Sequence, residues 1–367
     1  MSDTPIPPRR PPRHPRSRPP RGPRRRLAVA LFLFLAVLVR PTLGDAAELT
    51  LASTGRMEIN AMEYPWSAIG RVNVGGRGHC TGFLIGARQV LTAAHCFYDG
   101  DTGRWRSASE IHFVAGYQRD AYLIHSPVES YERSRKFDPS ASATPSNAVN
   151  DWAVLTLEKP IGRQAGWLGL RHLDDQLLRR LRRGEARALQ AGYRRGWTHI
   201  MSASLNCAIT GFFQGRNGIL HSCSISKGDS GSPLLVLDGG KFRVVGLHVI
   251  NANTNTGKVA GVLSVRLFHA KTGDRQAIRA VQRAGAAWSA GHPPQQGGPA
   301  NPLPLQTIDQ LLDGLQLAEA APPPSTSARR DPAQRTAAIA AFQSQRGLPV
   351  TGRATFDLLG SLIQATP

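Results

Sequence analysis

The sequence predicts a mainly β protein, with an all-β barrel or sandwich domain followed by a small helical segment. Between residues 57 and 270, short apolar runs alternate with Gly, Asn and Asp, a spacing typical of many short strands. After residue 288, a stretch rich in Pro, Gly and Gln leads into segments whose apolar residues recur at helical spacing. A length of 367 residues suits two such units.

The apolar runs of the β region place its clearest strands. These runs cover residues 66–72, 81–85, 111–115, 152–157, 188–193, 233–237 and 242–250. Residues 276–287 then have helical character and would close this domain. We therefore expect a first folded domain over residues 47–287 and a linker over residues 288–303.

Residues 304–367 predict a three-helix domain. Residues 305–317 carry apolar side chains at helical spacing, and residues 322–327 (Pro-Pro-Pro-Ser-Thr-Ser) form a loop. Asp331 is expected to cap a second helix with Pro332 at its first position, and Gly347 to follow its last turn. Thr355 is expected to cap a third, shorter helix.

The N-terminal region has the features of a leader and an export signal. The first 26 residues are rich in Arg and Pro and lack apolar periodicity, which predicts disorder. Residues 27–39 are apolar, too short to span a bilayer comfortably but suited to the core of a secretory signal. Cleavage after Ala46 would define a leader and signal over residues 1–46. The protein would then be periplasmic or secreted, and would contact a membrane only if the signal stayed uncleaved as an anchor.

The charge balance is strongly basic. The whole chain has a net charge of +20, and residues 47–367 keep 35 basic against 23 acidic residues, or +12. Such a charge favours anionic surroundings such as a cell wall, anionic lipid or nucleic acid. Residues 177–183 hold four arginines, but no interleaved aromatic residues or groove-reading motif accompany them. We interpret that run as a solvated loop or short helix and expect no nucleic-acid partner.

Four cysteines in an exported chain indicate two disulfides, and the residues alone leave three pairings open. The cysteines form no CxxC pair, and the histidines form neither an HExxH motif nor a ligand cluster. The sequence therefore implies neither a metal site nor a cofactor.

Two motifs indicate nucleophilic catalysis. Ser230 lies in residues 227–233 (Lys-Gly-Asp-Ser-Gly-Ser-Pro), and His95 lies in residues 91–96 (Leu-Thr-Ala-Ala-His-Cys). A serine hydroxyl needs an adjacent base to remove its proton, and a histidine base needs a carboxylate on its other ring nitrogen. Asp151 is the candidate carboxylate, because it enters what we interpret as a buried strand. The Gly-Asp-Ser-Gly turn would leave the N–H groups of Gly228 and Ser230 free to hold an oxyanion.

These segments resemble the landmarks of the trypsin-like serine peptidases. The resemblance covers roughly residues 57–285 and includes residues 80–85, 90–96, 151–154 and 228–233, with His95, Asp151 and Ser230 in the family's chain order. The bacterial glutamyl endopeptidase branch is most similar, since its nucleophile motif also ends in Ser-Gly-Ser-Pro. The resemblance implies a chymotrypsin-like double six-stranded β-barrel with the site between the barrels. It also implies the pairings Cys80–Cys96 and Cys207–Cys223.

The resemblance also assigns a substrate-binding region, less clearly than the catalytic residues. The position of Ser224 is an aspartate in trypsin proper, so a preference for Arg or Lys is not supported. His248 occupies the place where glutamyl endopeptidases have a histidine that helps to recognise a substrate carboxylate, and Lys227 adds a nearby cation. Both suggest acidic or polar substrate side chains, although a structural role for His248 stays open. Val249 and Asn251 would border the pocket, and Gly261 matches the glycine of its back wall.

The position of Asp229 pairs, in that family, with the amino group of a newly cut N-terminus. A cut between Arg56 and Met57 would lie a plausible distance upstream of His95. The usual Ile-Val-Gly-Gly start is absent there, because the chain continues Met-Glu-Ile-Asn. Activation by cleavage after Arg56 is therefore a hypothesis.

The C-terminal segment resembles the three-helix peptidoglycan-binding domain. Residues 338–352 contain a Phe-Gln helix followed by a Gly-Leu turn, but Thr351 replaces the aspartate of the family's Asp-Gly turn. The resemblance implies peptidoglycan as a partner. The alternative is a helical appendage that packs on the first domain and binds no wall.

Together these resemblances imply an exported serine endopeptidase that acts on proteins or peptides and is held at peptidoglycan. Two other functions stay open. One is a catalytically silent wall-binding or interaction scaffold, and the other is a nucleic-acid-binding protein that uses its basic surface.

Overall fold

The computed structural model describes residues 55–75, 78–141, 144–254, 257–269, 273–283, 303–315 and 330–366. The predicted leader and signal (1–46), the predicted loop (322–327) and all of the predicted linker (288–303) except Leu303 lie outside the described residues. Within the part that is described, no helix combines the length and apolarity needed to cross a membrane.

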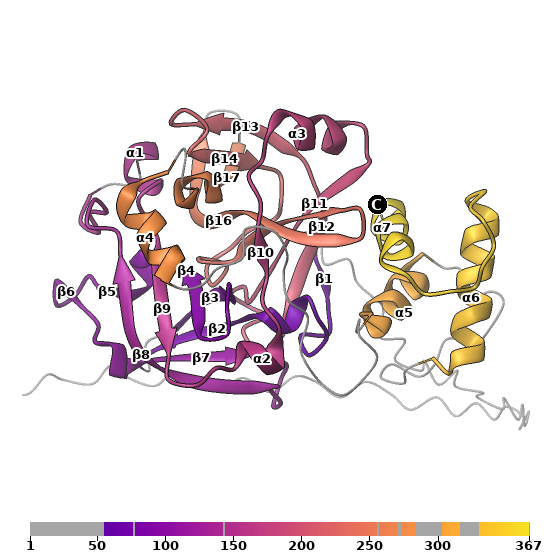
Figure 1. Cartoon of the computed structure of the whole chain (residues 1–367), viewed down its shortest axis with the longest axis horizontal. Coiled ribbons are helices and arrows are strands. Elements are labelled where there is room, and N and C mark those ends of the chain that lie inside the picture. The colour runs from indigo at the N-terminus through magenta and orange to yellow at the C-terminus, as the bar shows by residue number, and fades with distance from the viewer. Residues whose placement is uncertain are drawn as a thin grey trace, which may run out of the picture. The chain divides into compact units, whose positions relative to one another are not determined.

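The first half of the β region is a closed antiparallel barrel (Figure 1). Its interior is apolar, with Val72, Phe83, Val90, Phe113 and Leu155 fully buried. Within the described residues, the barrel strands follow one another in the order β2 (Ile69–Val74), β3 (Gly78–Leu84), β4 (Gln89–Thr92), β9 (Ala153–Leu157), β8 (Ile124–Arg133) and β7 (Ile111–Ala115). The predicted strand over residues 111–115 has these bounds in the structure.

The second half contains, within the described residues, a nine-stranded sheet. Its strands are β1 (Met57–Glu58), β12 (Ser202–Cys207), β11 (Ala186–Gly192), β15 (Pro233–Asp238), β16 (Lys241–Thr254), β17 (Gly257–Ser264), β14 (Gly218–His221) and β13 (Ile209–Phe213), with β10 (Gly169–Leu170) beside β16. Only Ala208 separates β12 from β13, so one chain segment pairs with β11 near its start and with β14 near its end. The sheet path therefore returns on itself, as the predicted second barrel requires.

Short elements connect the strands. They are the 3₁₀ helices η1 (Trp66–Ala68), η2 (Ala94–Phe97), η3 (Ala108–Glu110) and η4 (Val265–Phe268), the hairpin β5 (Tyr98–Asp99) and β6 (Arg104–Trp105), and the helices α1 (Pro145–Ala148), α2 (Gly162–Ala165), α3 (Asp175–Arg182) and α4 (Arg275–Arg283). The helix predicted over 276–287 is α4.

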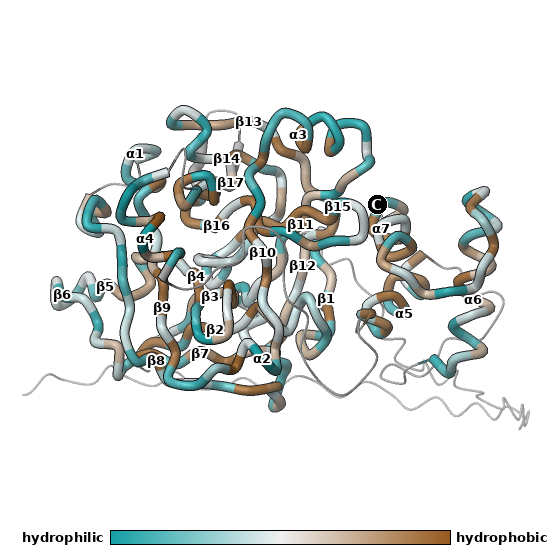
Figure 2. Tube along the Cα trace, viewed as in Figure 1, coloured by the Kyte–Doolittle hydropathy of each residue, from teal (hydrophilic) through white to brown (hydrophobic). Residues whose placement is uncertain are grey.

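The arginine-rich run forms the short helix α3. Asp174 caps this helix by accepting the backbone N–H of Leu177 at 2.7 Å, and Leu177 is buried against the second half. Arg180 pairs with Asp238 at 2.8 Å, and Arg183 pairs with Glu185 at 2.6 Å. Figure 2 shows α3 as largely hydrophilic. These observations fit the prediction of a solvated short helix.

The predicted C-terminal helices are present as α5 (Leu305–Gly314), α6 (Pro332–Gln345) and α7 (Phe356–Ala365). Asp331 caps α6 by accepting the N–H groups of Ala333 and Gln334, and Thr355 caps α7. Gly347 follows α6 with φ of +63°, a conformation that glycine adopts without strain. The sequence signals for helix ends were therefore correct.

The C-terminal helices contact the β region. The Glu63 carboxylate accepts the backbone N–H groups of Gln306 (3.0 Å) and Thr307 (3.3 Å) at the start of α5. The Trp66 indole donates to the Thr307 hydroxyl at 3.1 Å. Apolar residues of all three helices belong to the same hydrophobic cluster as the first barrel. The predicted boundary between two independent domains stays a prediction.

Candidate active site

His95 and Asp151 are brought together by two paired strands. Thr92 at the end of β4 lies opposite Ala153 at the start of β9, so the chain just beyond β4 lies beside the chain just before β9. Asp151 is 3% exposed, and its Oδ1 accepts the backbone N–H of His95 at 2.8 Å. Its Oδ2 lies 2.6 Å from His95 Nδ1. A carboxylate on Nδ1 favours the tautomer that carries its proton there and leaves Nε2 as the basic nitrogen.

The environment of His95 raises the pKa of its imidazole. Burial by itself lowers this pKa, because it disfavours the charged ring, but the attraction of Asp151 and its hydrogen bond outweigh that effect. The His95 side chain is still 35% exposed, so the ring remains reachable from outside. The pair therefore combines a buried carboxylate with an accessible imidazole.

The Cys80–Cys96 disulfide attaches the His95 segment to the barrel. It joins β3 to η2, and the second predicted bond, Cys207–Cys223, joins the end of β12 to the segment after β14. Both predicted pairings are therefore confirmed. Within the part that the structure describes, Cys80, Cys96 and His95 come close enough together to suggest metal ligands. The disulfide consumes both thiolates, so this group does not have the donors of a metal site.

Ser230 lies on a tight turn ahead of β15. The backbone N–H of Asp229 donates to Ser226 at 3.1 Å, and those of Gly231 and Ser232 donate to His248 and Asp229, each at 2.8 Å. The N–H groups of Gly228 and Ser230 have no acceptor among the described residues. The turn therefore leaves available the two donors that were predicted.

Gly228 is the residue that lets the turn close. Its φ is +94°, and a Cβ there would lie 2.3 Å from the carbonyl oxygen of Tyr193. No other residue type fits without moving that backbone. The Gly228 carbonyl oxygen accepts the Thr81 hydroxyl at 2.8 Å, which ties the turn to β3.

The turn packs directly on the segment that carries His95. The backbone N–H of Thr81 donates to the Ser230 carbonyl oxygen at 2.8 Å. A Cβ at Gly231 would lie 2.1 Å from the Thr81 carbonyl oxygen and 3.0 Å from the backbone nitrogen of Ala93, two residues before His95. The three predicted catalytic residues therefore come from segments that touch one another.

The predicted substrate-binding residues lie on neighbouring segments of the second half. Val249 is half-buried on β16, Asn251 is exposed there, and Gly261 on β17 is paired with Ile250. Ser224 is half-buried, and its backbone N–H donates to the Ser204 hydroxyl at 3.2 Å.

His248 is buried, and so is a second histidine, His221, which no sequence motif marks. The two rings lie 6.0 Å apart in a T-shaped arrangement, with β17 between their strands. Within the described residues, His248 Nδ1 and His221 Nε2 are buried without a hydrogen-bond partner. Burial lowers the pKa of His221 to about 4 and lowers that of His248 well below its usual value. Only the strand pairing, which the sequence does not display, brings these rings together.

Arg56 is the second residue whose place in the site the sequence did not reveal. Its side chain is fully buried and pairs with Asp229 at 3.2 Å. The sequence suggests Arg56 only as the residue before a cut and gives no sign of this contact.

The trypsin family model matches residues 54–269, more than half of the chain. The chain therefore belongs to the trypsin family of serine peptidases. Together with the strand pairing, this membership confirms the predicted fold class.

Two individual proteins illustrate the likeness. A glutamyl endopeptidase of Bacillus licheniformis is 30% identical over 119 residues, which cover 32% of this chain and 35% of that protein. The chain thus matches about a third of that relative's length. A solved structure of Glu endopeptidase in complex with MPD is 19% identical, with a TM-score of 0.46, and the match covers 63% of this chain and 97% of the other.

Proposed function

We propose that the protein is a serine endopeptidase that hydrolyses peptide bonds with His95, Asp151 and Ser230. The observation that carries this proposal is the His95–Asp151 pair, with Oδ2 2.6 Å from Nδ1, beside the turn that presents Ser230. Membership of the trypsin family supports it.

The reaction would proceed in two stages. Ser230 Oγ attacks the scissile carbonyl carbon while His95 Nε2 takes the hydroxyl proton, and His95 then gives that proton to the leaving amine. This leaves an acyl-enzyme, which water hydrolyses with His95 again acting first as base and then as acid. Asp151 keeps the imidazole oriented and stabilises its charged form in both stages.

The N–H groups of Gly228 and Ser230 would hold the oxyanion of each tetrahedral intermediate. Neither has an acceptor among the described residues, and Gly228 has a φ of +94°, a conformation that glycine adopts without strain. Preorganised donors of this kind stabilise charge that develops only in the transition state, which is why they accelerate the reaction.

For substrate choice, we propose a preference for Glu or Asp before the scissile bond. Among the described residues, His248 is buried with an unpartnered Nδ1, and the His221 ring, with an unpartnered Nε2, lies 6.0 Å from it. Burial lowers the pKa of His248 well below its usual value, which favours the neutral ring. A substrate carboxylate would favour a protonated, donating ring, and His221 could stabilise that ring through its own neutral imidazole. Exposed Lys227 adds positive charge immediately before Gly228 in the chain.

We also propose that the protein is exported and held at peptidoglycan by residues 304–367. Two disulfides support an oxidising compartment. The Gln343 carboxamide binds the turn after α6, accepting the N–H groups of Thr351 and Gly352 at 2.8 and 2.9 Å, so this segment has an ordered turn. Co-sedimentation with purified peptidoglycan, compared with a chain ending at residue 303, tests this assignment. Equal sedimentation of the two chains would favour a helical appendage that binds no wall.

The experiment that tests the activity uses a fluorophosphonate probe and an unbiased peptide library. We expect the protein to be labelled and to cleave peptides, and Ser230→Ala to do neither. A folded protein that takes up no label would instead support a catalytically silent scaffold.

A further inference from the structure

A buried cation lies beneath the nucleophile turn. The Arg56 side chain is fully buried, and its three guanidinium nitrogens all donate to acceptors inside the protein. Arginine is among the residues least often buried, and when it is buried it is normally paired. Its partner is Asp229, the residue immediately before Ser230, with Nη1 3.2 Å from Oδ2.

The same guanidinium joins three segments of the site. Nη1 also donates to the Ser224 carbonyl oxygen at 2.8 Å, in the predicted specificity pocket, and to Gln190 Oε1 on β11 at 2.6 Å. Nη2 donates to the Ser202 carbonyl oxygen at 2.6 Å, and Nε to the Ser202 hydroxyl at 3.1 Å, both on β12. The planar fork of arginine can hold several acceptors at fixed angles in this way, whereas an ammonium group is a point charge.

Asp229 is held on its other side as well. Its Oδ2 accepts the backbone N–H of Ser226 at 3.0 Å, and its Oδ1 accepts the Gln190 carboxamide at 3.2 Å. Gln190 also donates to the Ser232 hydroxyl at 2.6 Å, beyond Ser230. Asp229 and Ser232, on either side of Ser230, therefore belong to one polar network. Among the residues named in that network, Arg56 is the one that carries a permanent positive charge.

We propose that Arg56 is a positioning residue, and that its guanidinium holds Asp229 so that the oxyanion turn is assembled in the uncut chain. This inference depends on the proposed peptidase function. It assigns to an internal side chain the pairing that a newly formed terminal amine would otherwise supply. Arg56 does not touch the substrate; it acts by fixing the turn that carries the N–H groups of Gly228 and Ser230.

The position of the Arg56–Met57 bond fits this inference. Arg56 is fully buried and Met57 is 6% exposed, and Met57 pairs with Ala203 in the ladder between β1 and β12. A peptidase that cuts after arginine must enclose that side chain, which is here inside the protein. Cleavage at this bond is therefore not the step that completes the site.

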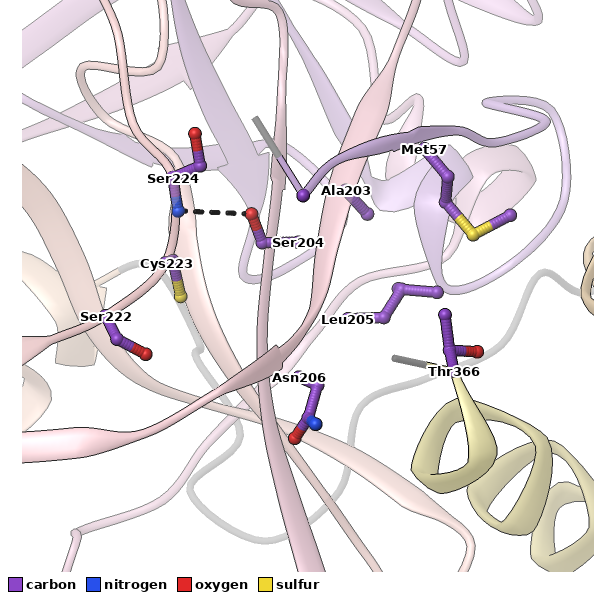
Figure 3. Close-up of a pocket in the computed structure, with 10 residues that line it drawn as sticks. Met57, Ala203, Ser204, Leu205, Asn206, Ser222, Cys223, Ser224 and Thr366 are labelled. Atoms are coloured by element: carbon purple, nitrogen blue, oxygen red, sulfur yellow. Dashed lines mark hydrogen bonds between the residues drawn. The ribbon is translucent and has the colours of Figure 1, made fainter. Parts of the chain in front are cut away.

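A small pocket runs beside this network, and Figure 3 shows its lining. It has a volume of about 180 Å³ and is bordered by Gly55 and Met57, on either side of Arg56, and by Ser204, Ser224 and Thr366. Arg56 itself does not line this pocket, but Ser224, whose carbonyl oxygen accepts a hydrogen bond from Arg56 Nη1, does. That makes chemical rescue a suitable test.

The first experiment compares Arg56→Ala with Arg335→Ala, a control that removes another buried Arg–Asp pair. Arg335 binds Asp309 at 2.8 and 2.7 Å in the C-terminal helices, away from the turn. We expect Arg56→Ala to lower the rate of fluorophosphonate labelling and kcat/KM about 10²–10³-fold, the effect of losing an oxyanion donor. Guanidinium at low millimolar concentration should raise both rates of Arg56→Ala at least tenfold, and the same concentration of NaCl should not. Arg335→Ala should keep wild-type rates and show no rescue.

Arg56→Lys gives a pH readout that a purely structural role would not produce. The charged and titratable groups that face this position are Asp229, which favours a cation, Arg194, which disfavours one, and His248, whose pKa Arg56 helps to lower. A buried lysine loses its proton far more readily than arginine, so Arg56→Lys should be partly active near neutral pH and lose activity as the pH rises. The wild type should show no such alkaline loss. Wild-type rates in Arg56→Ala, or a loss that guanidinium does not reverse in folded protein, would overturn the inference.

A second experiment decides the question even if Arg56→Ala does not fold. Wild-type protein beginning upstream of Arg56 is labelled with the fluorophosphonate, and intact mass then shows which forms carry the label. Labelling of chains in which the Arg56–Met57 bond is intact supports the inference. Labelling confined to chains cut at that bond overturns it, while the peptidase function stands. If no form is labelled, the peptidase function itself is wrong, and the inference fails with it.

Discussion

The two halves of the β region hold the proposed catalytic residues by different means. The half that carries His95 and Asp151 is a closed barrel with an apolar interior, and the Cys80–Cys96 bond secures the His95 segment to it. The half that carries Ser230 holds its turn through the buried Arg56–Asp229 pair and its polar partners. Apolar packing is spread over many contacts, whereas a buried ion pair concentrates its effect in two side chains. We therefore expect the base to tolerate single changes around it better than the nucleophile turn does.

The largest loss of kcat should come from a change in the half that carries His95, because a single carboxylate, that of Asp151, orients the His95 ring. Asp151→Asn should lower kcat about 10⁴-fold, because the amide favours the wrong tautomer of His95. The folded state should persist, since the side chain keeps its size. Steady-state kinetics with a melting curve measures both, and Asp175→Asn, on the exposed surface of α3, is the control. A fall of less than tenfold would remove Asp151 from the catalytic group.

The disulfides offer a direct comparison between the halves. Cys80–Cys96 and Cys207–Cys223 both span a sequence separation of 16, so the loop-entropy model predicts the same loss of unfolding free energy, about 3 kcal/mol, from breaking either bond.

Only the Cys80→Ser/Cys96→Ser pair should also lower kcat in protein that remains folded, because that bond holds the His95 segment. Denaturant unfolding and kinetics on both double variants test this. Equal kcat in the two would show that apolar packing alone positions the base.

Substrate choice should depend on the nucleophile half. His248→Phe should reduce the ratio of kcat/KM for peptides with Glu before the cut to that for matched peptides with Gln. A hydrogen bond to a charged group contributes about 1.5–3 kcal/mol, so we expect a reduction of roughly 10- to 150-fold.

His221→Phe should have a smaller effect in the same direction, because His221 acts only through His248. Library profiling of the three proteins provides the measurement. An unchanged ratio in His248→Phe would assign that ring a structural role.

The smallest effect we predict is a shift in pH dependence. The pKa of His95 is raised, and His95 must be neutral to act as the base, so kcat/KM should fall on the acid side with a midpoint above about 6.5. The contribution of His95 to the free energy of unfolding changes with pH in the opposite direction. Charged His95, paired with Asp151, stabilises the folded state fully below the ordinary pKa of histidine, and this contribution is lost as the pH rises through the raised pKa. A pH–rate profile with a midpoint below 6.5 would contradict this.

Local signals predicted much of what the structure contains. The apolar runs over residues 111–115 and 233–237 are strands because short, β-branched and aliphatic runs between turn residues suit a buried pleated surface. The helix signals at Asp331, Gly347 and Thr355 were correct because capping involves only residues a few positions apart. The catalytic motifs were visible for the same reason, since each is a short run of residues around one side chain.

The sequence by itself determined the family, the strand and helix segments, and the residues of the proposed catalytic motifs, because each of these features depends on residues that are close together in the chain. Only the tertiary structure decided that Arg56 pairs with Asp229, 173 positions away, and that the His221 ring lies beside the His248 ring. It also decided that Glu63 caps helix α5, which begins more than 240 residues later. These contacts depend on how strands pair across the second sheet and on how the C-terminal helices pack. The local pattern of a sequence does not specify which charged residue, distant in the chain, will be buried next to a given side chain.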